Sequence, residues 1–380
     1  MAVSDGATEL APDLPAVVEG EDEGTVLVLR ALGLGDAVTA IPALRGIRRA
    51  WPGRRVLLAA PAEVGSWLVG LGLVDGVVPT RGLAPLRWVD EAETVTGMPA
   101  AGHVAVNLHG SGPESHRVLL ATEPDRLVAF ASGEAGVDGP AWDRDEHEVD
   151  RWCRLVTSAG GECAREDLRL EPPAPRDAHV VVHPGAASGS RRWPAERFAA
   201  VVRHLADAGY DVVVTGSADE RELCERVVAE ATDAHAPVPT GSPTDTPTGS
   251  ATGDRARTRR GAVDHAAGVL DLPALADVVA TALLVVSGDT GVAHLATAYG
   301  TPSVVLFGPT PPALWGPAIE PDRHVVLWHG EDVLPAAHGE PAPYRGDPHG
   351  EDLDPALERV TVDEVTDAAD ALLADEQTGR

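Results

Sequence analysis

Lysine is absent from this 380-residue chain, so all 30 of its basic residues are arginine, against 59 acidic residues. The formal net charge is -29 at pH 7. Nucleic-acid binding depends on neutralising phosphates with basic groups, so a chain this acidic is a poor candidate for it. An anionic membrane surface would repel the chain for the same reason. Any phosphate that it binds must be held locally, by backbone amides and a few placed arginines.

Cysteine and long apolar runs are also scarce. The three cysteines, Cys153, Cys163 and Cys224, lack metal-ligand spacing, which argues against a disulfide framework or a zinc site. Residues 1–23 are acidic and lack the apolar segment of a signal peptide, so we expect a disordered leader. No apolar run reaches the ~20 residues of a membrane-spanning helix. We therefore expect a cytoplasmic protein with no transmembrane segment, no metal and no other cofactor.

The chain does contain two series of alternating strands and helices. This alternation predicts an α/β fold with two open parallel sheets, one in each half. Pro42 is expected to kink a helix predicted over 36–50. A Pro-rich linker is predicted at 171–178. The predicted strands are 25–29, 56–59, 76–78 and 103–107 in the first half, and 179–183, 211–216, 283–288 and 303–308 in the second.

Two segments interrupt this order. Residues 232–260 are rich in Pro, Gly, Ser and Thr and carry almost no large apolar groups. They cannot bury enough surface to offset the entropy of ordering, so we expect a flexible surface insertion. Residues 331–355 are expected to be irregular, and a final helix is predicted over 361–374.

Ligands of open α/β sheets bind beyond the carboxyl ends of the strands, and the first candidate motif, residues 30–36, follows a strand. Its glycines, Gly33 and Gly35, let the backbone approach a ligand, and the helix start behind them favours negative charge. Asp36 is either a helix cap, the commoner role, or a functional carboxylate. The glycine pattern is not a full dinucleotide fingerprint.

Three further motifs follow strands of the second half. Residues 183–193 form a small-residue loop with arginines near a helix start, which suits either a diphosphate site or a plain connection. Residues 288–294 bring Asp289 and Thr290 to another helix start, where amides and a hydroxyl suit a phosphate. His294 follows in the first turn, where a lone histidine is more often structural. Residues 308–310 are by themselves only a turn signal.

Together, these motifs resemble glycosyltransferase family 9, the ADP-heptose:lipopolysaccharide heptosyltransferases. The resemblance covers about residues 25–320 in the family's order. Arg192 stands where the family usually has lysine, and the 232–260 insertion is atypical. The matching residues are Arg30, Gly35, Asp36 and Pro42–Leu44, then His183–Ala186 with Arg192–Pro194, Gly216 with Asp219 and Glu220, Asp289–Gly291 with His294–Ala296, and Phe307–Thr310.

The resemblance implies a GT-B fold, in which two Rossmann-like domains face each other across a cleft. Residues 24–170 would bind the acceptor and residues 179–330 the nucleotide-sugar donor. Residues 331–380 would form an irregular tail whose final helix packs back onto the first domain.

The implied reaction is an inverting, metal-independent transfer of a sugar, of heptose type, from a nucleotide diphosphate to a hydroxyl of an unidentified glycan or lipid-linked acceptor. Asp36 would deprotonate that hydroxyl, while Arg192 would stabilise the departing diphosphate. The donor-binding residues implied are Gly35, Gly185, Ala186, Ser188, Gly216, Glu220, Asp289, Thr290, Gly291, His294, Gly308, Pro309 and Thr310.

Two other functions stay open on the residues alone. A nucleotide-sugar epimerase would use the same donor loops without an acceptor, and a non-catalytic nucleotide-sugar-binding protein would not need Asp36. A dehydrogenase fits less well, because the first glycine loop lacks the full fingerprint. On the acceptor side, residues 107–111 follow a strand and are predicted to line the cleft.

Overall fold

A computed structural model describes residues 24–86, 102–233, 260–333 and 344–378. The predicted leader and most of the 232–260 insertion lie outside the described residues. Within the described chain, no helix combines the length and apolar character that crossing a membrane requires. Cys153, Cys163 and Cys224 are free thiols.

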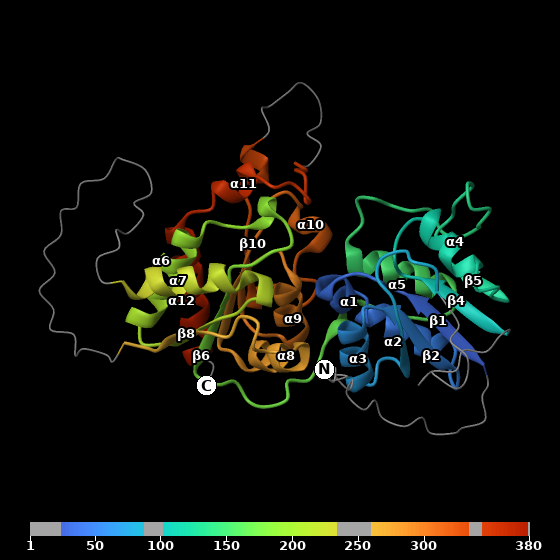
Figure 1. The fold of residues 1–380 in the computed structure, drawn as a ribbon, viewed down its shortest axis with the longest axis horizontal. Coiled ribbons are helices and arrows are strands. Elements are labelled where there is room, and N and C mark those ends of the chain that lie inside the picture. Colours follow the sequence, from blue (N-terminus) through green and yellow to red (C-terminus); the bar gives the residue numbers. More distant parts are fainter. Residues whose placement is uncertain (1–23, 87–101, 234–259, 334–343, 379–380) are drawn as a thin grey trace, which may run out of the picture.

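The first half forms a five-stranded parallel sheet in the order β3-β2-β1-β4-β5 (Figure 1). Every residue of the central strand β1 is buried, as its continuous apolar sequence predicts for a strand covered on both faces. The chain order of the strands reverses between β1 and β4, so the loops after these strands open at the switch point where such sheets bind ligands. The elements are β1 (Thr25–Leu29), α1 (Leu34–Thr39), α2 (Ile41–Ala50), β2 (Arg55–Ala60), α3 (Ala62–Gly70), β3 (Gly76–Pro79), β4 (His103–Asn107), α4 (Glu114–Leu120), β5 (Arg126–Val128), α5 (Glu148–Ser158) and η1 (Arg165–Leu168).

The second half forms a six-stranded parallel sheet in the order β11-β10-β9-β6-β7-β8. Its switch point lies between β6 and β9, and both sheets have the strand order of a Rossmann fold. The elements are β6 (His179–His183), η2 (Gly189–Arg191), α6 (Ala195–Asp207), β7 (Asp211–Val214), η3 (Ala218–Glu220), α7 (Arg221–Thr232), β8 (Val263–His265), α8 (Leu272–Thr281), β9 (Leu284–Gly288), α9 (Gly291–Tyr299), β10 (Ser303–Leu306), α10 (Pro312–Trp315), η4 (Pro321–Arg323), β11 (His324–Leu327), η5 (Gly330–Asp332), α11 (Pro355–Glu358) and α12 (Val362–Thr378).

The first helix differs from its prediction. The expected single helix over 36–50 is two helices, α1 and α2, separated at Ala40. Pro42 lies in the first turn of α2, where its missing N–H costs nothing, so it begins a helix rather than kinking one. The N-cap of α1 is Gly33, which leaves Asp36 in the first turn and not at the cap position.

The final helix also differs from its prediction. Helix α12 packs onto the second domain and not onto the first, beside α6 (Figure 1). Its buried residues, such as Val365 and Leu372, join the core that contains Phe198 and Val286. The sequence pattern indicated that the helix has an apolar face, but it did not indicate which surface covers that face.

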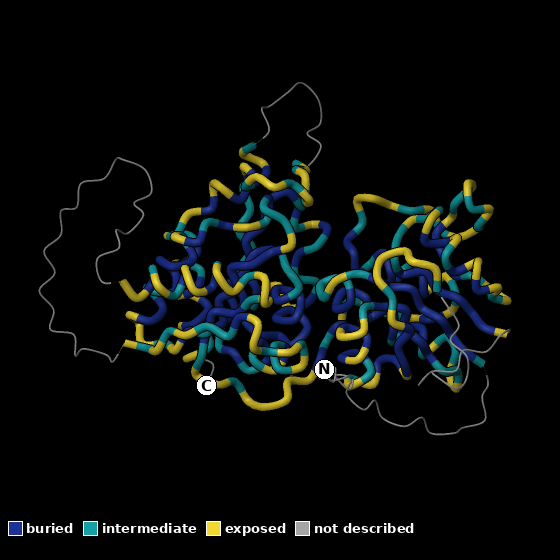
Figure 2. Tube along the Cα trace, viewed as in Figure 1, coloured by how far each residue is buried: buried dark blue, intermediate teal, exposed yellow. Residues whose placement is uncertain are grey.

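One of the apolar clusters spans both halves. Figure 2 shows the buried residues concentrated along both sheets. The cluster that contains Val38 and Ile41 of the first half also contains Val292 and Leu295 of α9. The contact between the halves is therefore partly hydrophobic, which favours a defined arrangement of the two domains.

Two glycines make this contact close. A Cβ added at Gly35 would lie 2.9 Å from Cδ2 of His294, and one added at Gly291 would lie 2.8 Å from Cβ of Leu34. Carbon atoms do not approach this closely, so α1 and α9 meet at a distance that larger residues would prevent.

We expect Gly291→Ala to lower the free energy of unfolding by about 1–3 kcal/mol, because the added methyl overpacks the contact between α1 and α9. Gly70→Ala is the matched control, since an added Cβ there has no neighbour within 4 Å among the described atoms. Urea denaturation checks both variants. Equal midpoints for the two would show that the contact tolerates a methyl group.

Deletion of residues 234–259 is expected to leave the melting temperature nearly unchanged, because their composition offers little apolar surface to bury. The segment is shorter than the predicted insertion, since Thr232 ends α7 and Arg260 contacts the fold. Arg260 donates to the Ala231 carbonyl at 3.0 Å and pairs with Asp207 at 2.9 Å. Differential scanning calorimetry of the deletion variant checks this, and a large loss of melting temperature would contradict it.

Candidate active site

The candidate site lies where loops from the two sheets meet. The loops after β1 and β4 leave the switch point of the first sheet, and those after β6 and β9 leave the switch point of the second. Because the first turns of α1 and α9 pack against each other, Asp36 is brought close to Asp289, whose pKa it raises. The structure thus assembles motifs that lie more than 250 residues apart in the sequence.

Asp36 lies in the first turn of α1 with 29% of its side chain exposed. Its Oδ1 lies 3.2 Å from Nη2 of Arg30, and the backbone at Gly33 also favours the ionised form of the carboxylate. Burial raises the pKa of Asp36, and Arg30 only partly offsets this effect. A reachable carboxylate with a raised pKa is suited to accept a proton from a ligand.

Arg30 is the buried cation behind Asp36, with only 2% of its surface exposed. Its Nε donates to the backbone oxygen of Asp36 at 2.9 Å, and its Nη1 donates to the Leu108 carbonyl at 2.5 Å. Its Nη2 donates to Oε1 of Glu148 at 2.8 Å. One guanidinium therefore connects the loops after β1 and β4 to the start of α5, and its donors are satisfied as a buried charge requires.

Glu148 is the first residue of α5, with 5% of its side chain exposed. Its Oε1 also accepts from Nε1 of Trp152 at 2.7 Å, and its Oε2 accepts from Nη1 of Arg151. Burial favours the neutral form, but Arg30 and Arg151 more than compensate, so the pKa of Glu148 lies below its ordinary value. Sequence analysis missed this residue, because nothing in its local pattern indicates a partner 118 positions away.

His109, in the predicted 107–111 segment, follows Leu108 and contacts the loop after β1 with its side chain. Its Nδ1 accepts from the Ala31 backbone N–H at 3.2 Å, which places the ring proton on Nε2. Burial, aided by Arg30, lowers the pKa of His109 to about 4, so the ring is neutral at pH 7. Asn107, by contrast, is buried and donates to Ser115 at 2.8 Å.

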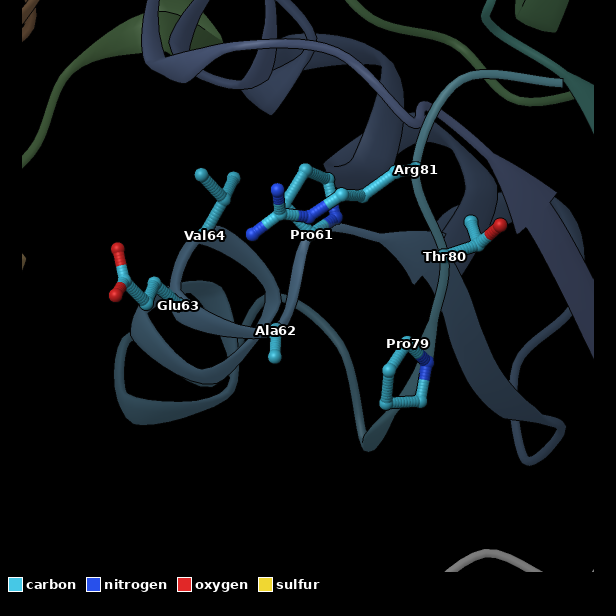
Figure 3. A pocket seen from close by; sticks show the side chains of 7 residues that line it. All are labelled: Pro61, Ala62, Glu63, Val64, Pro79, Thr80 and Arg81. Atoms are coloured by element: carbon cyan, nitrogen blue, oxygen red, sulfur yellow. The ribbon is translucent and has the colours of Figure 1, made fainter. Parts of the chain in front are cut away.

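A pocket of about 390 Å³ lies at the same sheet edge, beyond the carboxyl ends of β2 and β3 (Figure 3). It is formed by the start of α3 and residues 79–81. Figure 3 shows the side chain of Arg81 extending across Pro61 toward Val64. The sequence offered no signal for this pocket, which depends on two strand ends being neighbours.

The donor-side candidate is the N-terminus of α9. Thr290 is its N-cap but makes no side-chain capping bond, and its Oγ1 is buried without a hydrogen-bond partner among the described residues. The first amides of a helix have no intrahelical acceptor. A free hydroxyl beside such amides is an arrangement that binds phosphate oxygens.

Asp289 and Arg191 flank this helix start. Asp289 is 6% exposed, and burial raises its pKa to about 6, with Arg191 opposing and Asp36 adding to the shift. Nη1 of Arg191 donates to the Asp289 backbone oxygen at 3.4 Å, whereas the exposed Arg192 donates to the Ala186 carbonyl at 2.9 Å. Arg191 is thus a second cation near α9 that sequence analysis did not single out.

His294 packs between the two domains. Its Nε2 lies 3.9 Å from Oδ1 of Asp289, and its ring centroid lies 5.8 Å from that of Trp315. Burial lowers the pKa of His294 to about 4, so it carries no charge near pH 7. Its contact with Gly35 gives it a packing role at the domain junction.

Gly185, Gly216 and Glu220 come together as a second group of predicted donor residues. Oε2 of Glu220 accepts from the backbone and hydroxyl of Ser217 at 2.8 and 2.9 Å, which forms a capping box. Side chains larger than hydrogen at Gly185 would collide with the Glu220 carboxylate. The glycine therefore leaves room for this carboxylate at the end of β6.

Ser188, Gly308 and Pro309 have a different environment, because the segment 344–354 covers them. The Ser188 hydroxyl donates to the Pro348 carbonyl at 2.7 Å, and the Gly346 N–H donates to the Pro309 carbonyl at 2.9 Å. A Cβ at Gly308 would lie 3.0 Å from Cβ of Leu357. These contacts give the three residues a packing role, and Thr310 beside them is half-buried.

The segment 344–354 also reaches the first domain, since Arg345 pairs with Asp145. It lies within residues 331–355, which were predicted to be irregular, and its coverage of two donor loops was not foreseen from the sequence. Among the described residues, no group of three His, Cys, Asp or Glu side chains is placed to hold a metal ion.

Comparison with known proteins extends these observations. Residues 143–239 and 250–336 match the model of glycosyltransferase family 9 (heptosyltransferase). The chain is 27% identical over 183 residues to lipopolysaccharide heptosyltransferase 2 of Escherichia coli strain K12, a stretch that covers 47% of this chain and 44% of that protein. It is 24% identical over 336 residues to lipopolysaccharide heptosyltransferase 1 of Pseudomonas aeruginosa, covering 77% and 80% of the two chains. The match to the first of these relatives thus spans less than half of that protein's length.

Solved structures share the fold. The Escherichia coli ADP-heptose lps heptosyltransferase II superimposes with a TM-score of 0.64 at 19% identity, over 93% of this chain and 99% of that one. A glycosyl transferase family 9 structure from Veillonella parvula superimposes with a TM-score of 0.65 at 17% identity, over 94% and 100%. These likenesses support the predicted GT-B fold of two Rossmann-like domains. Together with the family match and the order of the motifs, they show that the chain is a heptosyltransferase-like member of glycosyltransferase family 9.

Proposed function

We propose that this protein transfers a sugar of heptose type from a nucleotide diphosphate to a hydroxyl of a glycan or lipid-linked acceptor, with inversion and without a metal ion. The observation that carries the proposal is the approach of Asp36 to the N-terminus of α9. It places a carboxylate able to accept a proton beside a helix start that suits a phosphate. A group-transfer reaction needs these two elements on opposite sides of the reacting carbon.

In the proposed reaction, Asp36 takes the proton of the acceptor hydroxyl as its oxygen attacks the anomeric carbon. The bond between that carbon and the diphosphate oxygen breaks in the same step, and the nucleoside diphosphate leaves with the bonding electrons. Attack opposite the leaving group inverts the anomeric centre. The raised pKa of Asp36 makes it a better proton acceptor than an exposed aspartate.

The charge that develops on the departing diphosphate would be met from the second domain. Thr290 offers its free hydroxyl with the first amides of α9, and Arg191 and Arg192 supply positive charge near the same loops. Fixed donors aimed at a developing charge are an effective source of catalysis. Glu220, with one carboxylate oxygen beside Gly185, is proposed to bind the ribose hydroxyls.

Asp36→Asn distinguishes a base from a carboxylate with only a structural role. Asp36 is not the N-cap of α1, and Arg30 keeps Glu148 as a partner, so the similarly shaped asparagine should leave stability and donor binding near wild type. It cannot take the acceptor proton, so turnover should fall by about 10²–10⁴-fold. Steady-state transfer from ADP-heptose to a lipid-linked acceptor glycan, with thermal denaturation as the stability check, measures both effects.

The pH dependence gives an independent control on the same residue. The wild-type kcat/KM should fall as the pH drops through the raised pKa of Asp36, because the protonated carboxyl cannot act as a base. The residual activity of Asp36→Asn should lack this acid limb. An Asp36→Asn variant that transfers sugar at close to the wild-type rate would remove Asp36 from the mechanism.

Thr290→Val and Arg192→Ala test the donor site. Each should weaken ADP binding by about 1–3 kcal/mol, the loss of one hydrogen bond to a charged group. Thr290→Val should not destabilise the free protein, because the Thr290 hydroxyl has no partner among the described residues. Isothermal titration calorimetry measures the affinity, with Arg117→Ala as a control, since Arg117 pairs with Glu134 in the first domain. Unchanged ADP affinity in both variants would refute the donor assignment.

A further inference from the structure

The shared guanidinium of Arg30 points to a residue that acts on Asp36 indirectly. Nη2 of Arg30 lies 2.8 Å from Oε1 of Glu148 but 3.2 Å from Oδ1 of Asp36. The closer partner is therefore the carboxylate that no ligand reaches. Because both carboxylates are ionised when Asp36 acts as a base, they compete for one buried cation.

We propose that Glu148 is a positioning residue for the transfer reaction: by holding Arg30, it withholds part of that positive charge from Asp36 and so keeps Asp36 a competent base. The inference rests on the proposed function of Asp36. Glu148 itself is 5% exposed and lies behind Arg30, so it touches neither the acceptor nor the donor in this scheme.

Three contacts fix Glu148 and Arg30 in this arrangement. Trp152 donates to its Oε1 at 2.7 Å, Arg151 donates to its Oε2, and the Arg30 guanidinium lies 4.9 Å from the Trp152 ring centroid. Burial works against the Glu148 charge, yet Arg30 and Arg151 hold the pKa of Glu148 below its ordinary value, which favours its ionised form. A negative charge in this position raises the pKa of Asp36.

Other titratable groups also face this region, and their effects on a titration have to be distinguished from the effect of Glu148. From the second domain, Asp289 has a pKa of about 6 and His294 a pKa of about 4, and Arg191 lies beside the Asp289 loop. From the first domain, His109 has a pKa of about 4, and burial lowers the pKa of His147 at the start of α5. A measurement must therefore report the Asp36 carboxyl itself, not the sum of these titrations.

The experiment follows the carbon-13 signal of the Asp36 carboxyl against pH, assigned by its loss in Asp36→Asn. In Glu148→Gln, Arg30 is left to Asp36 alone, and we expect the pKa of Asp36 to fall by roughly one unit. In Arg151→Gln, the Glu148 charge loses a neutralising partner, and we expect the pKa of Asp36 to rise. The acid limb of kcat/KM should move in the same direction in each variant.

Glu146→Gln is the matched control. It removes an equal charge two residues earlier, but Glu146 pairs with Arg154 at 2.7 Å, so the pKa of Asp36 should not change. Loss of packing alone would expose Asp36 and lower its pKa in both network variants, so opposite shifts exclude a merely structural role. If Glu148→Gln fails to fold, Arg151→Gln alone tests the inference: a rise in the pKa of Asp36 supports it, and no rise overturns it.

Two results would overturn the inference: an Asp36 pKa that is the same in Glu148→Gln and Glu146→Gln, or shifts of the same sign in Glu148→Gln and Arg151→Gln. The proposed base role of Asp36 fails on a different result, namely an active Asp36→Asn variant, and the proposed function fails if the wild-type protein transfers no sugar. The titration needs no substrate, so the two failures are distinguishable.

Discussion

The close packing of α1 against α9 is the constraint on which the candidate site depends. Each helix brings a glycine to the contact, Gly35 against His294 and Gly291 against Leu34, at distances that leave no room for a methyl group. Two Rossmann-like domains each bind ligands at their own switch point. Only because these helix starts touch do the two switch points form one site, with Asp36 on one side and Thr290 on the other.

This arrangement also explains how an acidic chain is compatible with the proposed diphosphate site. The net charge of -29 repels anions at long range, but the site relies on groups within a few ångströms. The helix start at Thr290 presents backbone amides, whose partial positive charge does not depend on composition. Arg191 and Arg192 add two cations from one short loop after β6.

Sequence patterns predicted eight of the eleven strands that the structure describes, the two sheets and the loops that carry the motifs, because these depend on local periodicity and on glycine turns. They missed β5, β8 and β11, which have only three or four residues each. The patterns failed where the answer depends on a partner distant in the sequence. The apolar face of α12 was visible, but its packing against the second domain was not. Glu148 and Arg191 gave no local signal, since each is defined by contacts across the fold. Pro42 was expected to kink one long helix, because no residue type at Ala40 indicates that the helix divides there into α1 and α2.

This part of the site needs an arginine, so the absence of lysine from the chain does not impair it. A lysine in place of Arg30 would lose hydrogen bonds that the guanidinium makes. Its Nε, Nη1 and Nη2 donate in fixed directions to the Asp36 carbonyl, the Leu108 carbonyl and the Glu148 carboxylate. A lysine ammonium is a compact charge on a flexible stem and does not hold three such acceptors in one plane. The same planar group lies over the Trp152 ring. A rigid fork that links the loops after β1 and β4 to α5 therefore holds the Asp36 segment, so the first domain positions the proposed base through its core.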